Sequence, residues 1–238
     1  MAADARPDER EGPKLTGDAP LPPDTIFALS SGAPPAAIAV VRISGPQADS
    51  ALQRLAGRLP EPRRASVADL HDGAGELLDR ALVLRFPGPN SATGEDLAEI
   101  HLHGGRSVVA GVLAALAALG GLRAAEPGEF TRRAFDNGRI ALAEAEGLAD
   151  LLEAETLAQR RAALALAGGA LSRRIDQWQT QLLALAAQIE AALDFSDEDD
   201  VEALPSGFAA AVGALGDEWR TQLGRPPVER LRDGVRVV

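Results

Sequence analysis

The sequence predicts an α+β protein, with short strands and turns in its N-terminal half and long helices in its C-terminal half. Residues 36–45 are almost continuously apolar, which is typical of a strand buried on both faces. Residues 97–102 alternate between two sets of side chains, as a strand with two different faces does. Beyond residue 140, Ala and Leu recur at helical spacing, with Glu and Arg between them. We therefore expect a mixed domain followed by a segment of helical bundle.

The first elements can be assigned in chain order. Residues 1–23 hold five Pro and mixed charge with almost no large apolar residue, so we expect a disordered tail. Ordered sequence is predicted to begin at Asp24, with a strand over residues 25–29. Pro46 suits the first turn of a helix, which we expect over residues 46–57.

The next segment is predicted to form a hairpin and a loop. Residues 66–70 and 77–86 have strand character on either side of the turn at 71–75. His71, at that turn, is expected to be a surface residue. Residues 87–96 are rich in turn formers and are predicted to be a loop.

A glycine pair follows the alternating strand at residues 97–102. His103-Gly104-Gly105 leads into a predicted helix over residues 106–119, which Gly120-Gly121 ends. A strand–Gly–Gly–helix junction offers free N–H groups to an anion, although the motif has low specificity. Residues 122–125 are predicted to form one more strand.

The chain changes character within residues 126–155. Pro127-Gly128 predicts a turn, and Glu129 then lies in the first turn of a short helix, where the helix dipole favours a carboxylate. Asp136-Asn137-Gly138 interrupts that helix, and a long amphipathic helix is expected to start near Ile140. From composition alone, the stretch is either an exposed connector or a functional motif.

The C-terminal half carries one extended apolar seam. Its members step alternately by four and three residues, and they are Leu171, Ile175, Trp178, Leu182, Leu185, Ile189 and Ala192. We expect this seam to pack against another helix of the chain, with self-association as the alternative. The acidic run 196–200 lacks the Asp/Gly pattern of a calcium loop, so we expect a solvated loop rather than a cation site. Residues 206–223 are predicted to form a further helix.

Composition argues against several kinds of site. The chain has no Cys, which excludes disulfides, Cys-zinc sites and thiol nucleophiles. Its one Lys, Lys14, is followed by Leu15, so the sequence holds no GxxxxGK[ST] phosphate-binding loop. A net charge of −11 argues against a direct nucleic-acid surface. With no signal peptide and no long apolar run, we expect a soluble cytoplasmic protein that does not bind membranes.

Two charged residues fall within the predicted strands. A guanidinium among β-branched residues is costly unless it is paired, so Arg42 either reaches solvent at the strand end or contacts an anion or ligand. Glu99 and His101 share one face of their strand. They mark either a solvated face or the wall of a pocket that presents a carboxylate.

Several motifs occur together in the order found in one family. They are DTI at 24–26, RISG at 42–45, FPxPNSxTGED at 86–96, HGG at 103–105, PGEF at 127–130, and DF with acidic residues from 194. From Asp24 to Val238 the chain resembles the MnmE (TrmE) family of bacterial tRNA-modification GTPases. The family's reactive C-terminal Cys has no counterpart in this sequence.

The resemblance implies a domain organisation. Residues 24–139 would fold like the folate-binding aminomethyltransferases, as an α/β domain that binds folate and dimerises. Residues 140–233 would be the first half of a helical domain. Residues 234–238 would open the first strand of a GTPase domain that is absent, and the sequence therefore has the character of a truncated chain.

The resemblance also implies a ligand and its contacts. The family positions that contact 5-formyl-tetrahydrofolate correspond to Arg42, Glu99 and Arg139. A carboxylate can accept two parallel hydrogen bonds from the 2-amino and ring N–H groups of a pterin, and arginine suits its carbonyl or carboxylates. Without a ligand, Arg42 and Glu99 could form an ion pair. None of the chain's residues is expected to be catalytic, and none to bind a metal.

Three departures from the family pattern bear on folate affinity. The glycine-rich loop is replaced by residues 32–39, which lack its Arg and most of its Gly. Ala92 stands where the family has an aromatic residue. Arg139 stands where the family has Lys, which keeps the charge but changes its reach and hydrogen-bond geometry.

The implied full-length protein is a homodimer that modifies the wobble uridine of tRNA at C5. It hydrolyses GTP with potassium and magnesium, and it works with the FAD-dependent partner MnmG. This segment would contact tRNA weakly or not at all. Two alternatives are a stand-alone folate-dependent one-carbon transferase, with Glu99 and His101 as acid and base, and a non-catalytic module whose helices bind partners.

Overall fold

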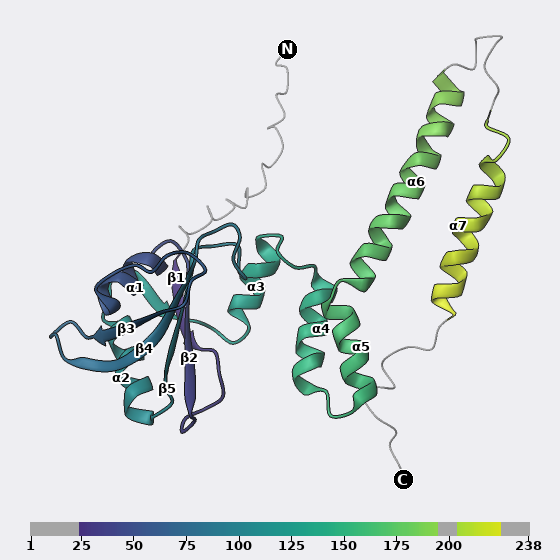
Figure 1. Ribbon diagram of the computed structural model, residues 1–238. Coiled ribbons are helices and arrows are strands. Elements are labelled where there is room, and N and C mark those ends of the chain that lie inside the picture. Colours follow the sequence, from purple (N-terminus) through teal and green to yellow (C-terminus); the bar gives the residue numbers. More distant parts are fainter. Residues whose placement is uncertain (1–23, 195–203, 225–238) are drawn as a thin grey trace, which may run out of the picture. The chain divides into compact units, whose positions relative to one another are not determined.

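A computed structural model describes residues 24–194 and 204–224 (Figure 1). The chain forms two compact units, residues 1–133 and 134–238, which divide within helix α3 (Glu129–Asp136). The predictions for the tail at 1–23, the acidic run at 196–200 and the terminal strand at 234–238 lie outside the described residues.

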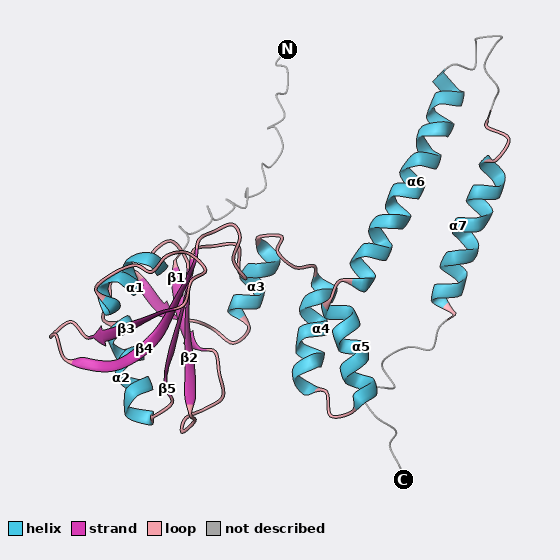
Figure 2. Ribbon diagram, in the orientation of Figure 1, coloured by secondary structure: helices cyan, strands magenta, loops and turns pink. Residues whose placement is uncertain are grey.

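The first unit contains a mixed sheet, whose strands are drawn in magenta in Figure 2. Its six strands have the order β3-β4-β5-β2-β1-β6. Neighbouring strands are antiparallel except β1 and β6, which run parallel. The strands are β1 (Thr25–Leu29), β2 (Ile38–Ser44), β3 (Ser66–His71), β4 (Leu77–Phe86), β5 (Leu97–His103) and β6 (Leu122–Ala124). All six strands were predicted from the sequence, and His71 is exposed, as expected.

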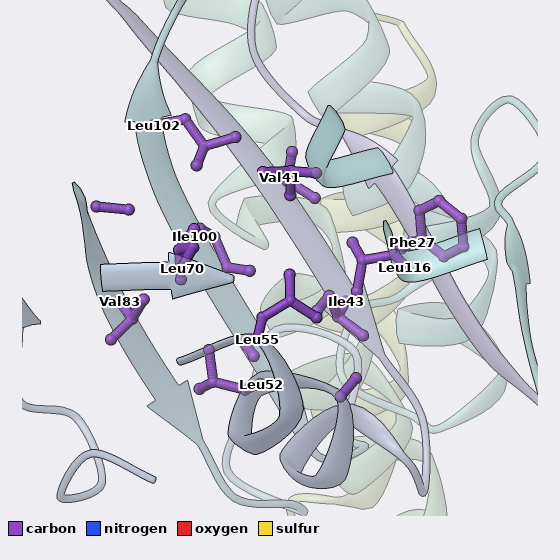
Figure 3. Packing of buried hydrophobic residues seen from close by; sticks show 14 of the residues in the cluster. Phe27, Val41, Ile43, Leu52, Leu55, Leu70, Val83, Ile100, Leu102 and Leu116 are labelled. Atoms are coloured by element: carbon purple, nitrogen blue, oxygen red, sulfur yellow. The ribbon is translucent and has the colours of Figure 1, made fainter. Parts of the chain in front are cut away.

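The hydrophobic core lies on one face of this sheet, between the strands and two helices. Helices α1 (Ala48–Ala56) and α2 (Arg106–Ala117) contribute Leu52, Leu55 and Leu116 to the same cluster (Figure 3). Alternate residues of the strands meet them, among them Val41, Ile43, Leu70, Val83, Ile100 and Leu102 (Figure 3). Both helices therefore cover the same face, since these strand residues share one side of the pleat.

The expectation that residues 36–45 form a strand buried on both faces is wrong. In β2, Ala39, Val41 and Ile43 are fully buried, whereas Ile38 is 61% exposed. On the opposite face of β2, Val40 and Arg42 are only partly buried, because α1 and α2 both pack on the first face; Ser44, at the end of the strand, is buried. The apolar run therefore concealed a strand with one open face, and Arg42 belongs to that face.

The second unit is helical. It contains α4 (Leu142–Glu153), α5 (Leu157–Ala167), α6 (Ala170–Asp194) and α7 (Phe208–Leu223). The expected long helix from Ile140 is instead divided between α4 and α5 at Thr156. There the Thr156 hydroxyl accepts a hydrogen bond from the backbone N–H of Gln159 over 3.2 Å, and the Gln159 side chain accepts one from the N–H of Thr156 over 2.8 Å. This reciprocal cap ends one helix and starts the next.

Close backbone approach joins α4 to α5. A Cβ at Gly147 would lie 2.4 Å from the backbone nitrogen of Ala167, so only glycine fits at this point. The apolar seam of α6 is covered in part by α7, as expected of a helix partner within the chain. Trp178 and Trp219 meet edge to face, with ring centroids 6.1 Å apart. Across the described part of the chain, no helix has the length and apolar character needed to cross a membrane.

Candidate functional site

The open face of the sheet carries an ion pair between its two central strands. Arg42 of β2 lies directly opposite Glu99 of β5 in the antiparallel register. The Arg42 Nε and Nη2 groups both donate to Glu99 Oε1, over 3.1 and 2.7 Å. Both side chains are largely but not fully buried, with 30% of Arg42 and 19% of Glu99 exposed. The structure thus brings together two of the three residues that the sequence suggested.

A histidine extends this pair along β5. His101 Nε2 lies 3.5 Å from the second oxygen of Glu99, Oε2. At this distance the contact is weak, so Oε2 is less firmly held than Oε1. Leu84 of β4 lies opposite Glu99, and Ala28 of β1 lies opposite Arg42. The charged group is therefore flanked by apolar side chains on both sides within the sheet.

An aromatic ring completes the surroundings of Arg42. Phe130, in the first turn of α3, lies with its ring centroid 5.7 Å from Arg42 Cζ. This separation is within the range of a cation–π contact. Phe130 belongs to the PGEF motif but was not among the expected site residues. A pairing between positions 42 and 130 is not visible in any local pattern.

A buried glutamate fixes the helix that carries Phe130. Glu129 is 2% exposed and accepts hydrogen bonds from Arg123, with Nη2 at 2.5 Å and Nη1 at 2.8 Å. It also accepts from the backbone N–H of Glu126 over 2.8 Å and from Arg133 Nη2 over 3.1 Å. The hydrogen bonds from Arg123 are the largest cause that lowers the pKa of Glu129, to about 2. The sequence assigned this carboxylate to the helix dipole, but the two guanidinium groups account for its burial.

The same arginines tie three separate motifs together. Arg133 Nη1 donates to Glu95 Oε2 over 3.1 Å, and Arg133 also pairs with Asp24. Glu95 Oε2 in turn accepts from the hydroxyl of Ser44 over 2.7 Å. Burial alone would raise the pKa of Asp24, but hydrogen bonds from Arg123 and Arg133 outweigh it and lower that pKa. The network links β2, the loop before β5 and α3.

Arg139, the third suggested contact, lies in the other unit. It follows α3, its side chain is exposed, and its backbone N–H donates to the carbonyl of Ala134 over 2.7 Å. Its membership of the folate site stays a prediction.

The HGG motif is built around a second carboxylate. His103 Nδ1 lies 2.8 Å from Asp79 Oδ1, and the backbone N–H of His103 donates to Asp79 Oδ2 over 2.8 Å. Burial opposes ionisation of Asp79, but the hydrogen bonds of His103 prevail and lower its pKa. A Cβ at Gly104 would lie 2.4 Å from the carbonyl oxygen of Ala36, so the glycine permits close contact with the loop before β2.

Two further features lie apart from the Arg42–Glu99 pair. A surface hollow of about 340 Å³ is lined by residues of α1, β3 and β4, and neither Arg42 nor Glu99 contributes to it. Within residues 24–194 and 204–224, no group of three His, Asp or Glu side chains is arranged to hold a metal ion.

Comparison with known proteins identifies both regions of the chain. Residues 25–139 match the family model described as the GTP-binding protein TrmE N-terminus, and residues 142–236 match the MnmE helical domain. The chain is 63% identical over 225 residues to the tRNA modification GTPase MnmE of Novosphingobium aromaticivorans, covering 90% of this chain and 52% of that protein. It is 66% identical over 218 residues to the MnmE of Rhizorhabdus wittichii, covering 90% of this chain and 50% of that protein.

The chain spans about half the length of the curated relatives that it matches. Its motifs and both of its structural regions nevertheless agree with the same assignment. The chain belongs to the MnmE (TrmE) family, of which it carries the N-terminal and helical regions.

Proposed function

We propose that the N-terminal region binds a reduced folate, 5-formyl-tetrahydrofolate, through Arg42 and Glu99, with Arg139 as a third contact. The observation that carries this proposal is the Arg42–Glu99 pair on the open face of the sheet. A guanidinium and a carboxylate in one partly buried position offer five donors and two acceptor oxygens to a planar heterocycle. Glu99 can accept from the 2-amino and ring N–H groups of a pterin, and Arg42 can donate to its carbonyl or to a carboxylate of the ligand.

The ligand would have to replace the bond between Arg42 and Glu99. The net contribution of a mostly buried ion pair to stability is small, because the cost of desolvating the two charges offsets most of their attraction. Two charge-assisted hydrogen bonds to a ligand each contribute roughly 1.5–3 kcal/mol. The exchange is therefore favourable if the pterin offers matching donors to Glu99 and an acceptor to Arg42. Since Glu99 Oε2 is the less firmly held oxygen, a pterin N–H group would reach it first.

In the whole protein, the bound folate would supply the one-carbon unit for modifying the wobble uridine of tRNA at C5. We propose that this chain forms a homodimer through its N-terminal region. GTP hydrolysis with potassium and magnesium would require a phosphate-binding loop that this sequence does not contain. The whole protein would work with an FAD-dependent partner of the MnmG type. The chain described here would then be a binding module without catalytic residues of its own.

Isothermal titration calorimetry of 5-formyl-tetrahydrofolate into the 238-residue chain tests the proposal. We expect binding that saturates at one site per chain, strongly weakened in Glu99→Gln and Arg42→Ala. Asp69→Asn is the matched control, because Asp69 pairs with Arg80 on the outer strands of the same sheet and is well exposed. An absence of binding at millimolar ligand, or equal loss in the control, would contradict the proposal.

One observation favours a second candidate, a folate-dependent one-carbon transferase. His101 Nε2 and Glu99 Oε2 are 3.5 Å apart, so an acid and a base would lie together beside a bound pterin. This alternative requires turnover of an aminomethyl donor by the isolated chain, and inactivity would exclude it. An interaction module that binds no folate would instead sediment as a dimer, and its melting temperature would not change when the folate is added.

A further inference from the structure

We propose that Phe130 is a positioning residue of the folate site, which holds the Arg42 guanidinium in place when the ligand takes over Glu99. The inference rests on the proposed function, because it concerns the same site. It names an aromatic residue of the PGEF motif as part of the binding machinery. Its basis is the contact between the Phe130 ring and Arg42.

Arg42 must be held in one orientation to bind the ligand. An arginine side chain has many rotamers, and holding its guanidinium in one orientation costs conformational entropy. Two neighbours fix it here, the Glu99 carboxylate and the Phe130 ring. A ligand that takes the Glu99 oxygens removes the first of them. The ring is then the contact that keeps Arg42 directed at the ligand.

The N–H groups of a guanidinium lie in its plane and point outward from its edges, whereas a cation–π contact uses the region above an aromatic face. Phe130 has no hydrogen-bonding group in its side chain, so it restrains Arg42 without occupying any of the five N–H donors. All of those donors stay available, first to Glu99 and then to the ligand. A polar residue at position 130 would compete for them.

The position of Phe130 is itself fixed through helix α3. Helix α3 has eight residues, which is too short for a stable isolated helix. Its first residue, Glu129, is buried among hydrogen bonds from Arg123 and Arg133. Arg133 also binds Glu95, whose other partner Ser44 lies two residues after Arg42 on β2. The ion-pair network therefore fixes the ring relative to the strand that carries its target.

The test is a double-mutant cycle read by calorimetry with 5-formyl-tetrahydrofolate and the 238-residue chain. Phe130→Leu removes the ring but keeps an apolar side chain, and we expect the Kd to rise by about three- to tenfold. Phe130→Tyr retains the ring and should stay within about twofold of the natural chain. In the Arg42→Ala background, Phe130→Leu should have no further effect, because the residue on which it acts is gone.

Phe135→Leu is the matched control, since Phe135 lies on the same helix and is exposed. Phe130→Met is measured alongside, so that a folding defect in one variant does not remove the test. If the natural chain binds the folate, and Phe130→Leu and Phe130→Met bind it with the same Kd as the natural chain, the positioning role is overturned while the folate site stands. If Phe130→Leu raises the Kd by the same factor in the Arg42→Ala background as in the natural chain, Phe130 acts independently of Arg42 as a structural residue. That result would also overturn the positioning role. If the natural chain does not bind, the proposed function itself fails and the inference fails with it.

Discussion

The two units of this protein bury the same apolar residue types to different extents. In the first unit, Ile26, Ile43, Leu52 and Ile100 are fully buried, whereas Leu152 and Leu223 of the helical unit are 89% and 85% exposed. A sheet face collects side chains from several strands and can be covered by two helices at once. Helices that meet in pairs leave the rest of each helix surface open. Apolar spacing therefore identifies a helix, but not how much of its surface the neighbouring helices cover.

A core truncation in each unit should give the largest difference. Ile100→Ala should lower the free energy of unfolding of the first unit by about 4 kcal/mol, because it leaves a cavity in a closed core. Ile189→Ala, at a 43% exposed position of α6, should cost less than about 1 kcal/mol. Hydrogen exchange read by mass spectrometry separates the two units within one chain. Equal losses of protection would contradict the contrast between a closed and an open core.

The buried network of α3 should be nearly as sensitive. Glu129→Gln keeps the shape but leaves Arg123 and Arg133 partly uncompensated, and we expect a loss of about 3 kcal/mol. Glu126→Gln is the matched control, because its pair with Arg132 is exposed and should contribute at most about 1 kcal/mol. Denaturant titration of both variants measures the difference. A small effect for both would show that α3 is held by packing instead.

Ionisation of Glu129 should make the stability of the folded chain depend on pH. The pKa of Glu129 is lowered from 4.5 to about 2 in the folded chain. Ionised Glu129 therefore contributes about 3 kcal/mol to the free energy of unfolding. This contribution is fully present above pH 4.5 and is lost as the pH falls through 2. Asp24 and Asp79 act in the same direction, since their pKa values are also lowered. Urea midpoints between pH 6 and 2 measure the slope, which should flatten in Glu129→Gln.

The smallest effect is expected at the contact between α6 and α7. Trp219→Leu removes the edge-to-face contact with Trp178 and should cost about 1 kcal/mol. The change should appear as faster hydrogen exchange in α7 and altered fluorescence of Trp178. Leu223→Ala, at a highly exposed position of the same helix, should change neither. A result in which both variants behave alike would mean that the tryptophan pair does not hold the helices together.

Local pattern was enough to locate the strands and to place Glu99 and His101 on one face of β5, since a period of two places alternate residues together. It was not enough for β2, where an apolar run gave no sign that one face is open. The break between α4 and α5 could have been recognised, because Thr156 and Gln159 have the spacing of a capping box. The role of Glu129 could not have been recognised from the sequence, because its hydrogen-bond network reaches Asp24, which is 109 positions from Arg133.

The exchange of the Arg42–Glu99 bond for contacts to a folate can be followed by NMR at the side-chain Nε–H of Arg42. We predict that this signal shifts and saturates as 5-formyl-tetrahydrofolate is added, while that of Arg85, paired with Asp49 on the other side of the sheet, stays in place. An Arg42 signal that does not move at saturating ligand, or that moves no more than Arg85, would contradict the account.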